Sequence, residues 1–142
     1  MADSNTVNCG TDIPVITVDG PAGVGKGTLA KTLAAKYGFH YLDSGAIYRV
    51  VALEVLQRGL DSTQVEEIVE CATHLQISFP AEQQYSAHSN NIDIDGDIRS
   101  EQCSSMASRI AAQPAIRAQL LMLQKSFQRA PGLVCDGRDM GT

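Results

Sequence analysis

The stretch Val15-Ile16-Thr17-Val18-Asp19-Gly20-Pro21-Ala22-Gly23-Val24-Gly25-Lys26-Gly27-Thr28 decides the fold of this chain. Its first five residues are largely β-branched and apolar, which predicts a short buried strand, and a helical pattern follows the glycines. A strand, a glycine-rich loop and a helix in this order are the context of a phosphate-binding P-loop. Glycines let backbone N–H groups converge on phosphate oxygens, and the helix start adds free donors. Because Lys26 adds a full positive charge, we predict that the loop binds nucleotide phosphates.

The loop departs from the general P-loop pattern directly after the lysine, where Gly27 replaces the usual serine or threonine. Either the hydroxyl of Thr28 serves as a magnesium ligand, or phosphates and water hold the ion, an arrangement that Mg²⁺ accepts readily. Both alternatives stay open at this point. The Gly-Lys-Gly-Thr ending resembles the nucleoside monophosphate kinases more than the GTPases or the ATPase motors.

Composition limits the class of protein. The chain has 142 residues, enough for one domain, and 44% of them are apolar, as in ordinary globular proteins. Its net charge of −5 argues against a nucleic-acid-binding surface. We find no stretch apolar enough to span a membrane, and the polar residues 1–12 predict a disordered lead-in rather than a signal peptide. Widely spaced cysteines without a C-x-x-C pair predict reduced thiols in a cytoplasmic protein: Cys9, Cys71, Cys103 and Cys135.

The remaining pattern predicts an α/β fold. Strands that alternate with helices form βαβ units and therefore a parallel sheet. We expect three core strands, at residues 15–19, 39–42 and 132–136, and helices at residues 26–37, 46–57, 64–73, 101–112 and 115–128. Residues 75–79 and 92–94 instead alternate with period two around turn signals, which predicts a small antiparallel sheet inserted into this body.

Two further segments carry candidate binding residues. Ser44, Tyr48 and Arg49 fall at i, i+4 and i+5 near the start of one predicted helix, where a hydroxyl, a phenol and a guanidinium suit an anionic nucleotide. The structural alternative is an N-cap serine, a packed tyrosine and a solvated arginine. Asp136 ends the third core strand, and Arg138 and Asp139 follow it, for which the alternative is a loop salt bridge.

The phosphate loop, residues 42–49 and residues 136–142 together resemble the bacterial cytidylate kinases in both order and separation. The resemblance extends from about residue 14 to residue 142. It implies a P-loop NTPase-type parallel sheet, incomplete here with about three core strands, and an inserted antiparallel monophosphate-binding region at about residues 60–113. The family has a five-stranded core, a lid and further elements beyond this point. We therefore expect residues 13–142 to be a truncated P-loop kinase domain.

The resemblance also implies roles for individual residues. ATP would be the phosphoryl donor, with its phosphates held by Gly20, Pro21, Ala22, Gly23, Val24, Gly25, Lys26, Gly27 and Thr28. CMP or dCMP would be bound by Ser44, Tyr48, Arg49, Ser108, Arg117, Arg138 and Asp139. Lys26, Arg138 and Asp139 would be catalytic, and Thr28 and Asp136 would hold Mg²⁺ mainly through water.

The implied reaction is transfer of the γ-phosphoryl group of ATP to CMP or dCMP, with impaired activity expected for a fragment. The resemblance implies a cytoplasmic enzyme of pyrimidine metabolism that is monomeric at full length and has no nucleic-acid or membrane partner. One alternative is a non-catalytic nucleotide-binding module or one half of a split kinase. Another is a different small-molecule kinase, such as an adenylate or shikimate kinase, although residues 43–49 count against it.

Overall fold

A computed structural model of the 142 residues describes residues 3–8, 13–20 and 25–137. The chain forms two compact units. Unit 1 contains residues 1–44, 79–85 and 124–142, and unit 2 contains residues 45–78 and 86–123.

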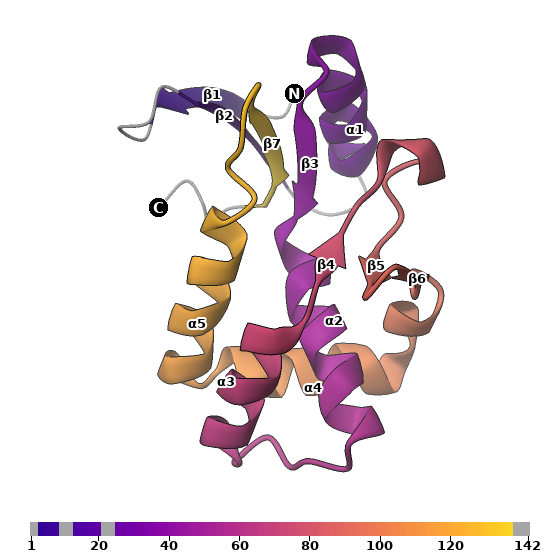
Figure 1. Ribbon diagram of the computed structural model, residues 1–142, viewed down its shortest axis with the longest axis vertical. Helices are drawn as coiled ribbons and strands as arrows, with labels where there is room; N and C mark the ends of the chain where they lie inside the picture. Colours follow the sequence, from indigo (N-terminus) through magenta and orange to yellow (C-terminus); the bar gives the residue numbers. More distant parts are fainter. Residues whose placement is uncertain (1–2, 9–12, 21–24, 138–142) are drawn as a thin grey trace. The chain divides into compact units, whose positions relative to one another are not determined.

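Unit 1 is built on the predicted parallel strands (Figure 1). β7 (Leu133–Asp136) lies between β2 (Pro14–Asp19) and β3 (His40–Asp43) and runs parallel to both. In this register Asp136 pairs with Val18 on one side and with Asp43 on the other. The three predicted core strands and their parallel arrangement are therefore confirmed. The carboxyl ends of the strands meet at one edge of the sheet, where the predicted phosphate loop leaves β2.

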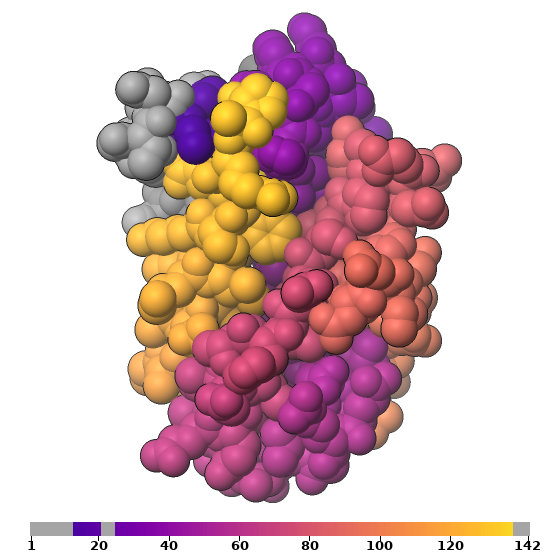
Figure 2. Space-filling model, in the orientation of Figure 1, coloured from indigo at the N-terminus to yellow at the C-terminus, as the bar shows by residue number. Residues whose placement is uncertain are grey.

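The helix α1 (Lys26–Tyr37) provides the crossover from β2 to β3, as the βαβ pattern predicts. Ala30 and Ala34 are fully buried, so small side chains let α1 approach the sheet closely. The opposite face of α1 is exposed, as the violet segment of Figure 2 shows. Gly38 ends the helix in the left-handed conformation, with φ of 66°, and its N–H bonds to the carbonyls of Ala34 and Ala35.

The N-terminal segment differs from the prediction. Residues 1–12 are expected to be disordered, but Asp3–Asn8 form β1, which pairs antiparallel with β2 from Asp3↔Asp19 to Asn8↔Pro14. The edge of β2 presents backbone N–H and C=O groups that need partners, and an extended backbone satisfies them whatever its side chains are. The polar composition of the segment does not reveal this. Residues 1–2 and 9–12 lie outside the described residues.

Unit 2 contains helices and the small sheet. Its helices are α2 (Ser44–Gln57), which begins in unit 1, α3 (Val65–His74), α4 (Glu101–Ala111) and α5 (Pro114–Lys125), whose last two residues belong to unit 1. β4 (Ile77–Ser78), β5 (His88–Ser89) and β6 (Ile92–Asp93) pair antiparallel in that order. The predicted small antiparallel sheet is therefore confirmed, with shorter strands than expected. One 3₁₀ helix, Asp97–Arg99, belongs to unit 2, and another, Ala81–Gln83, to unit 1.

Two of the predictions from composition concern the cysteines and membrane-spanning segments. Cys71, Cys103 and Cys135 are free and buried, whereas Cys9 lies outside the described residues. Within the described part of the chain, no helix combines the length and the apolar character needed to cross a membrane.

The buried apolar stripe of α5 provides a test of the core of unit 2. Ile116 and Leu120 are fully buried, Leu123 is half-buried, and Met122 on the same helix is 67% exposed. We expect Leu120→Ala to lower the free energy of unfolding by about 2–5 kcal/mol, because it removes buried methyl groups and leaves a cavity. Met122→Ala is the matched control, and its effect should stay within about 0.5 kcal/mol. Urea denaturation followed by circular dichroism measures both, and equal losses would contradict the burial of this stripe.

Candidate functional site

The described part of the phosphate loop ends in an open helix N-terminus. Gly25 is the N-cap of α1, adopts the left-handed conformation with φ of 80°, and provides no side-chain capping bond. The first turn of the helix also contains no acidic residue. Its backbone N–H groups and the positive end of the helix dipole are therefore suited to an anion. Pro21, Ala22, Gly23 and Val24 lie outside the described residues, so their predicted role is not tested.

An ion pair joins this helix start to the sheet. The Nζ atom of Lys26 contacts Oδ1 of Asp136, and the two side chains are 21% and 4% exposed. Burying a carboxylate costs free energy unless a charge or hydrogen bonds compensate it, so the lysine stabilises the ionised aspartate at this position. The P-loop lysine and the acid that ends the third core strand, 110 residues later in the chain, therefore form one site.

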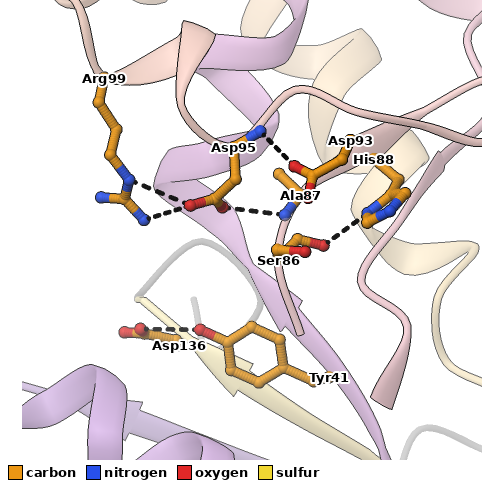
Figure 3. A network of polar contacts seen from close by, with 8 residues as sticks. All are labelled: Tyr41, Ser86, Ala87, His88, Asp93, Asp95, Arg99 and Asp136. Carbon is orange, nitrogen blue, oxygen red and sulfur yellow. Dashed lines mark hydrogen bonds and ion pairs between the residues drawn. The ribbon is translucent and has the colours of Figure 1, made fainter. Parts of the chain in front are cut away.

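Asp136 has two further hydrogen-bonding partners. The hydroxyl of Tyr41 donates to Oδ2 over 3.3 Å, as Figure 3 shows, and the hydroxyl of Ser44 donates to the backbone carbonyl over 3.1 Å. Ser44 is itself 7% exposed and is the first residue of α2. The site thus connects the phosphate loop, β7, β3 and the start of the helix that is predicted to bind the acceptor nucleotide.

Sequence reasoning did not select Tyr41. The parallel pairing of β3 with β7 puts Tyr41 opposite Val134 and Asp43 opposite Asp136. Since side chains alternate along a strand, Tyr41 shares a sheet face with Asp136. The only sequence signal is the position of this tyrosine two residues before Asp43, and its significance depends on a strand register that the sequence does not contain.

Two glycines lie where these segments meet, and one of them is required by the close approach. A Cβ atom at Gly27 would lie 3.6 Å from Oδ2 of Asp136, so the loop end and the strand end are in van der Waals range. A Cβ atom at Gly137 would lie 1.9 Å from Oγ of Ser44, and φ at Gly137 is 126°. The N–H of Gly137 donates to the carbonyl of Val18 over 3.1 Å. Gly137 therefore lets the chain leave β7 across the start of α2.

The residue types at the end of β7 and at the start of α1 fit the chemistry of a magnesium ion. Asp136 supplies a carboxylate, and Thr28, which is exposed on the first turn of α1, supplies a hydroxyl. Mg²⁺ prefers oxygen ligands and keeps several waters, so one carboxylate with substrate phosphates is sufficient. Among the described residues, no group of three or more His, Cys, Asp or Glu side chains is placed to hold a metal ion.

The other predicted acceptor-site residues belong to unit 2 or lie beyond the described part. Tyr48 and Arg49 are half-buried on α2, and Ser108 on α4 and Arg117 on α5 are exposed. Among the described residues, no side-chain hydrogen bond or ion pair joins Ser108 or Arg117 to another predicted site residue. Arg138 and Asp139 lie outside the described residues.

One contact in unit 2 links two of the helices that carry these candidates. The thiol of Cys103 on α4 donates to the backbone carbonyl of Arg49 on α2, with 3.0 Å between Sγ and O. Burial raises the pKa of this thiol, and the nearby charge of Arg49 opposes the shift. Cys103 therefore stays protonated at neutral pH and acts as a buried donor that helps to fix α2 against α4.

A second polar cluster, also drawn in Figure 3, has a structural role in unit 2. Asp95 accepts bonds from the backbone N–H of Ala87 at 2.9 Å and from the Arg99 guanidinium at 3.0 and 3.1 Å. The N–H of Asp95 donates to Oδ1 of Asp93 over 2.9 Å. These bonds hold the turn after β6 against the segment that leads into β5. Since Asp95 is engaged by a cation and a backbone donor, the cluster does not resemble a metal site.

The parallel sheet, the glycine loop and the buried aspartate facing its lysine define the class of P-loop α/β proteins. Comparison with known proteins gives the family within this class. Residues 16–142 match the family model described as cytidylate kinase. The chain is 50% identical over 130 residues to the cytidylate kinase of Vibrio parahaemolyticus and 50% identical over 133 residues to that of Photobacterium profundum. It is 46% identical over 131 residues to the cytidylate kinase of Nitrosomonas europaea.

The chain belongs to the cytidylate kinase family. The first two alignments cover 91% and 93% of this chain and 58% of each relative, and the third covers 92% of the chain and 57% of the relative. The chain thus spans somewhat more than half the length of the curated relatives that it matches.

The close approach at Gly137 can be tested by mutation. We expect Gly137→Ala to lower the free energy of unfolding by about 2–4 kcal/mol, because φ is unfavourable for alanine and the Cβ would displace the Ser44 hydroxyl from its bond to Asp136. Gly59→Ala is the control, since φ is 70° but no atom lies within 4 Å of the added Cβ. The control should cost about 1–2 kcal/mol. Chemical denaturation measures the difference, and similar losses would argue against the steric contact.

Proposed function

We propose that this chain binds ATP at the phosphate loop and carries the donor and acceptor sites of a cytidylate kinase, which moves the γ-phosphoryl group of ATP to CMP or dCMP. The observation that carries the proposal is the contact between Lys26 and Asp136 at the open N-terminus of α1. The family membership supports the choice of CMP as the acceptor.

Phosphoryl transfer depends on alignment and charge neutralisation more than on a dedicated base. The N–H groups at the start of α1 would bind the ATP phosphates, and Lys26 would leave Asp136 to contact the β- and γ-phosphate oxygens. Mg²⁺, when bound, neutralises the charge that develops on the phosphates. Asp136 would orient the water shell of the ion, and Thr28 would offer its hydroxyl to the same ion.

For the acceptor, we propose that Ser44, Tyr48 and Arg49 contact CMP from the first turns of α2. Ser108 and Arg117 would contribute to recognition of the cytosine and its phosphate. Arg138 and Asp139 would hold the CMP phosphate and sugar, and Arg138 would help Lys26 to neutralise charge during transfer. The family membership supports a role in pyrimidine metabolism. We propose a cytoplasmic location, where free thiols such as Cys71, Cys103 and Cys135 stay reduced.

A thermal-shift experiment tests the donor site. A ligand present at 100 times its Kd stabilises the folded state by about 2.7 kcal/mol, so saturating ATP with Mg²⁺ should raise the Tm of the chain by several degrees. Lys26→Met should abolish most of this shift because it removes the charge that meets the phosphates. Lys36→Met, at the other end of the same helix, should leave the shift unchanged. Equal shifts in the two variants would contradict the proposed site.

The acceptor and the reaction need separate measurements. With ATP present, CMP should raise the Tm more than AMP or UMP does. A coupled assay then compares ADP formation with and without CMP. CMP-dependent turnover supports the kinase, whereas binding of both nucleotides without transfer favours a nucleotide-binding module or one half of a split kinase.

A further inference from the structure

Tyr41 contributes a buried hydroxyl group to the Lys26–Asp136 site. The tyrosine is 4% exposed and lies on β3, and its hydroxyl donates to Oδ2 of Asp136 while Lys26 contacts Oδ1. The two oxygens of one carboxylate therefore have different partners. One partner is a flexible cation on the phosphate loop, and the other is a phenol on the central sheet.

Aromatic packing within unit 1 fixes the direction of this phenol. The ring of Tyr41 packs edge-on against Phe79, with 5.6 Å between centroids and 87° between planes, and lies 5.2 Å from the ring of Tyr85. Phe79 also packs against Phe127 at 6.0 Å. The Nζ atom of Lys31 lies 5.9 Å from the Tyr41 ring centroid, which places a positive charge near the ring face. A ring held from several sides cannot turn its hydroxyl away without disturbing its neighbours.

We propose that Tyr41 is a positioning residue for Asp136, keeping the carboxylate in place when Lys26 moves to the nucleotide phosphates. The proposal rests on the proposed binding of ATP at this loop. Lys26 has one positive charge, so its contacts with phosphate oxygens weaken its ion pair with Asp136. Asp136 is then a buried anion with less compensation from its cation, and the Tyr41 hydroxyl is the donor on the rigid side of the site.

The Tyr41–Asp136 bond leaves room for a closer approach of its two oxygen atoms. Its 3.3 Å is longer than the roughly 2.7 Å typical of a hydrogen bond between two oxygens. Without a nucleotide, Lys26 contacts Oδ1 of Asp136, so the Tyr41 hydroxyl shares the carboxylate with a cation that binds it more strongly. Once the lysine is released, the phenol is free to bond more closely, and Oδ1 stays directed at the loop where Mg²⁺ would bind.

Tyr41→Phe tests the role of the hydroxyl because it keeps the ring and its packing. In titration calorimetry with ATP and Mg²⁺, we expect the variant to raise the Kd about fivefold, since a hydrogen bond to a charged group is lost. With ATP and no metal, the Kd should change less than about twofold, because Asp136 does not attract bare ATP. Tyr85→Phe is the matched control, since its ring contacts Tyr41 in the same cluster, and both Kd values should stay at those of the parent chain.

Equal weakening with and without Mg²⁺ would overturn the proposal, because it would show a general disturbance of the loop. No change in either Kd would overturn it as well. A double-mutant cycle of Tyr41→Phe and Asp136→Ala, measured by denaturation without any ligand, should show a coupling of about fivefold in the unfolding equilibrium constant. Absence of coupling also overturns the proposal.

The two measurements separate this inference from the proposed function. If the parent chain fails to bind ATP, the donor-site proposal fails, and the positioning role toward Mg²⁺ and ATP fails with it. Coupling in the ligand-free cycle would then show that the bond is structural only. If the parent chain binds ATP with Mg²⁺ and Tyr41→Phe behaves like Tyr85→Phe, the donor site stands and the positioning role alone is overturned.

Discussion

The contact between Lys26 and Asp136 is the interaction on which the rest of the site depends. A carboxylate that is 4% exposed needs a compensating charge, and the cation comes from a loop that starts at the neighbouring strand. The contact is possible because β7 lies beside β2 in the register that pairs Asp136 with Val18. At Gly27 an added Cβ atom would lie 3.6 Å from Oδ2 of Asp136, so the loop end packs directly against the carboxylate. The buried charge and the strand register therefore act together as one constraint on the site.

The backbone around Asp136 extends this constraint to the predicted acceptor helix. Ser44 begins α2 and bonds to the carbonyl of Asp136, while Gly137 passes so close to Ser44 that no side chain fits there. Two roles are predicted for Ser44, a nucleotide contact or a residue that caps the helix start, and these roles are not mutually exclusive. In the present state its hydroxyl is bound to the backbone of β7. A nucleotide that bonds to the Ser44 hydroxyl would have to share it with the Asp136 carbonyl or replace that bond. Binding at the proposed acceptor site would therefore affect the end of β7, which carries Asp136.

Much of this arrangement could be predicted from local sequence patterns. Residues 15–28 predict the strand, loop and helix α1, and the apolar run before Asp136 predicts β7. Each of these two predictions uses a local signal, because the residues that form the pattern lie next to one another in the sequence. Tyr41 could not be found in this way, since its significance depends on a partner 95 residues away and on the register between β3 and β7. The strand β1 could not be predicted for a related reason, because pairing at a sheet edge uses backbone groups and has little effect on amino-acid composition.

The same ion pair bears on how a chain of net charge −5 would attract the anionic nucleotide of the proposed function. Without a ligand, the charge of Lys26 is largely compensated by Asp136, so a phosphate that approaches alone must break one ion pair to form another. It gains little, because the abandoned carboxylate is buried and negative beside it. A phosphate that arrives with a divalent cation can form two ion pairs, because Lys26 can contact the phosphate while the Asp136 carboxylate contacts the cation and its water. The number of favourable charge contacts is then conserved or increased. A half-buried lysine paired with a buried aspartate at the start of α1 would therefore favour nucleotides that arrive with their metal, as the proposed function requires, provided that the carboxylate keeps its position during the exchange.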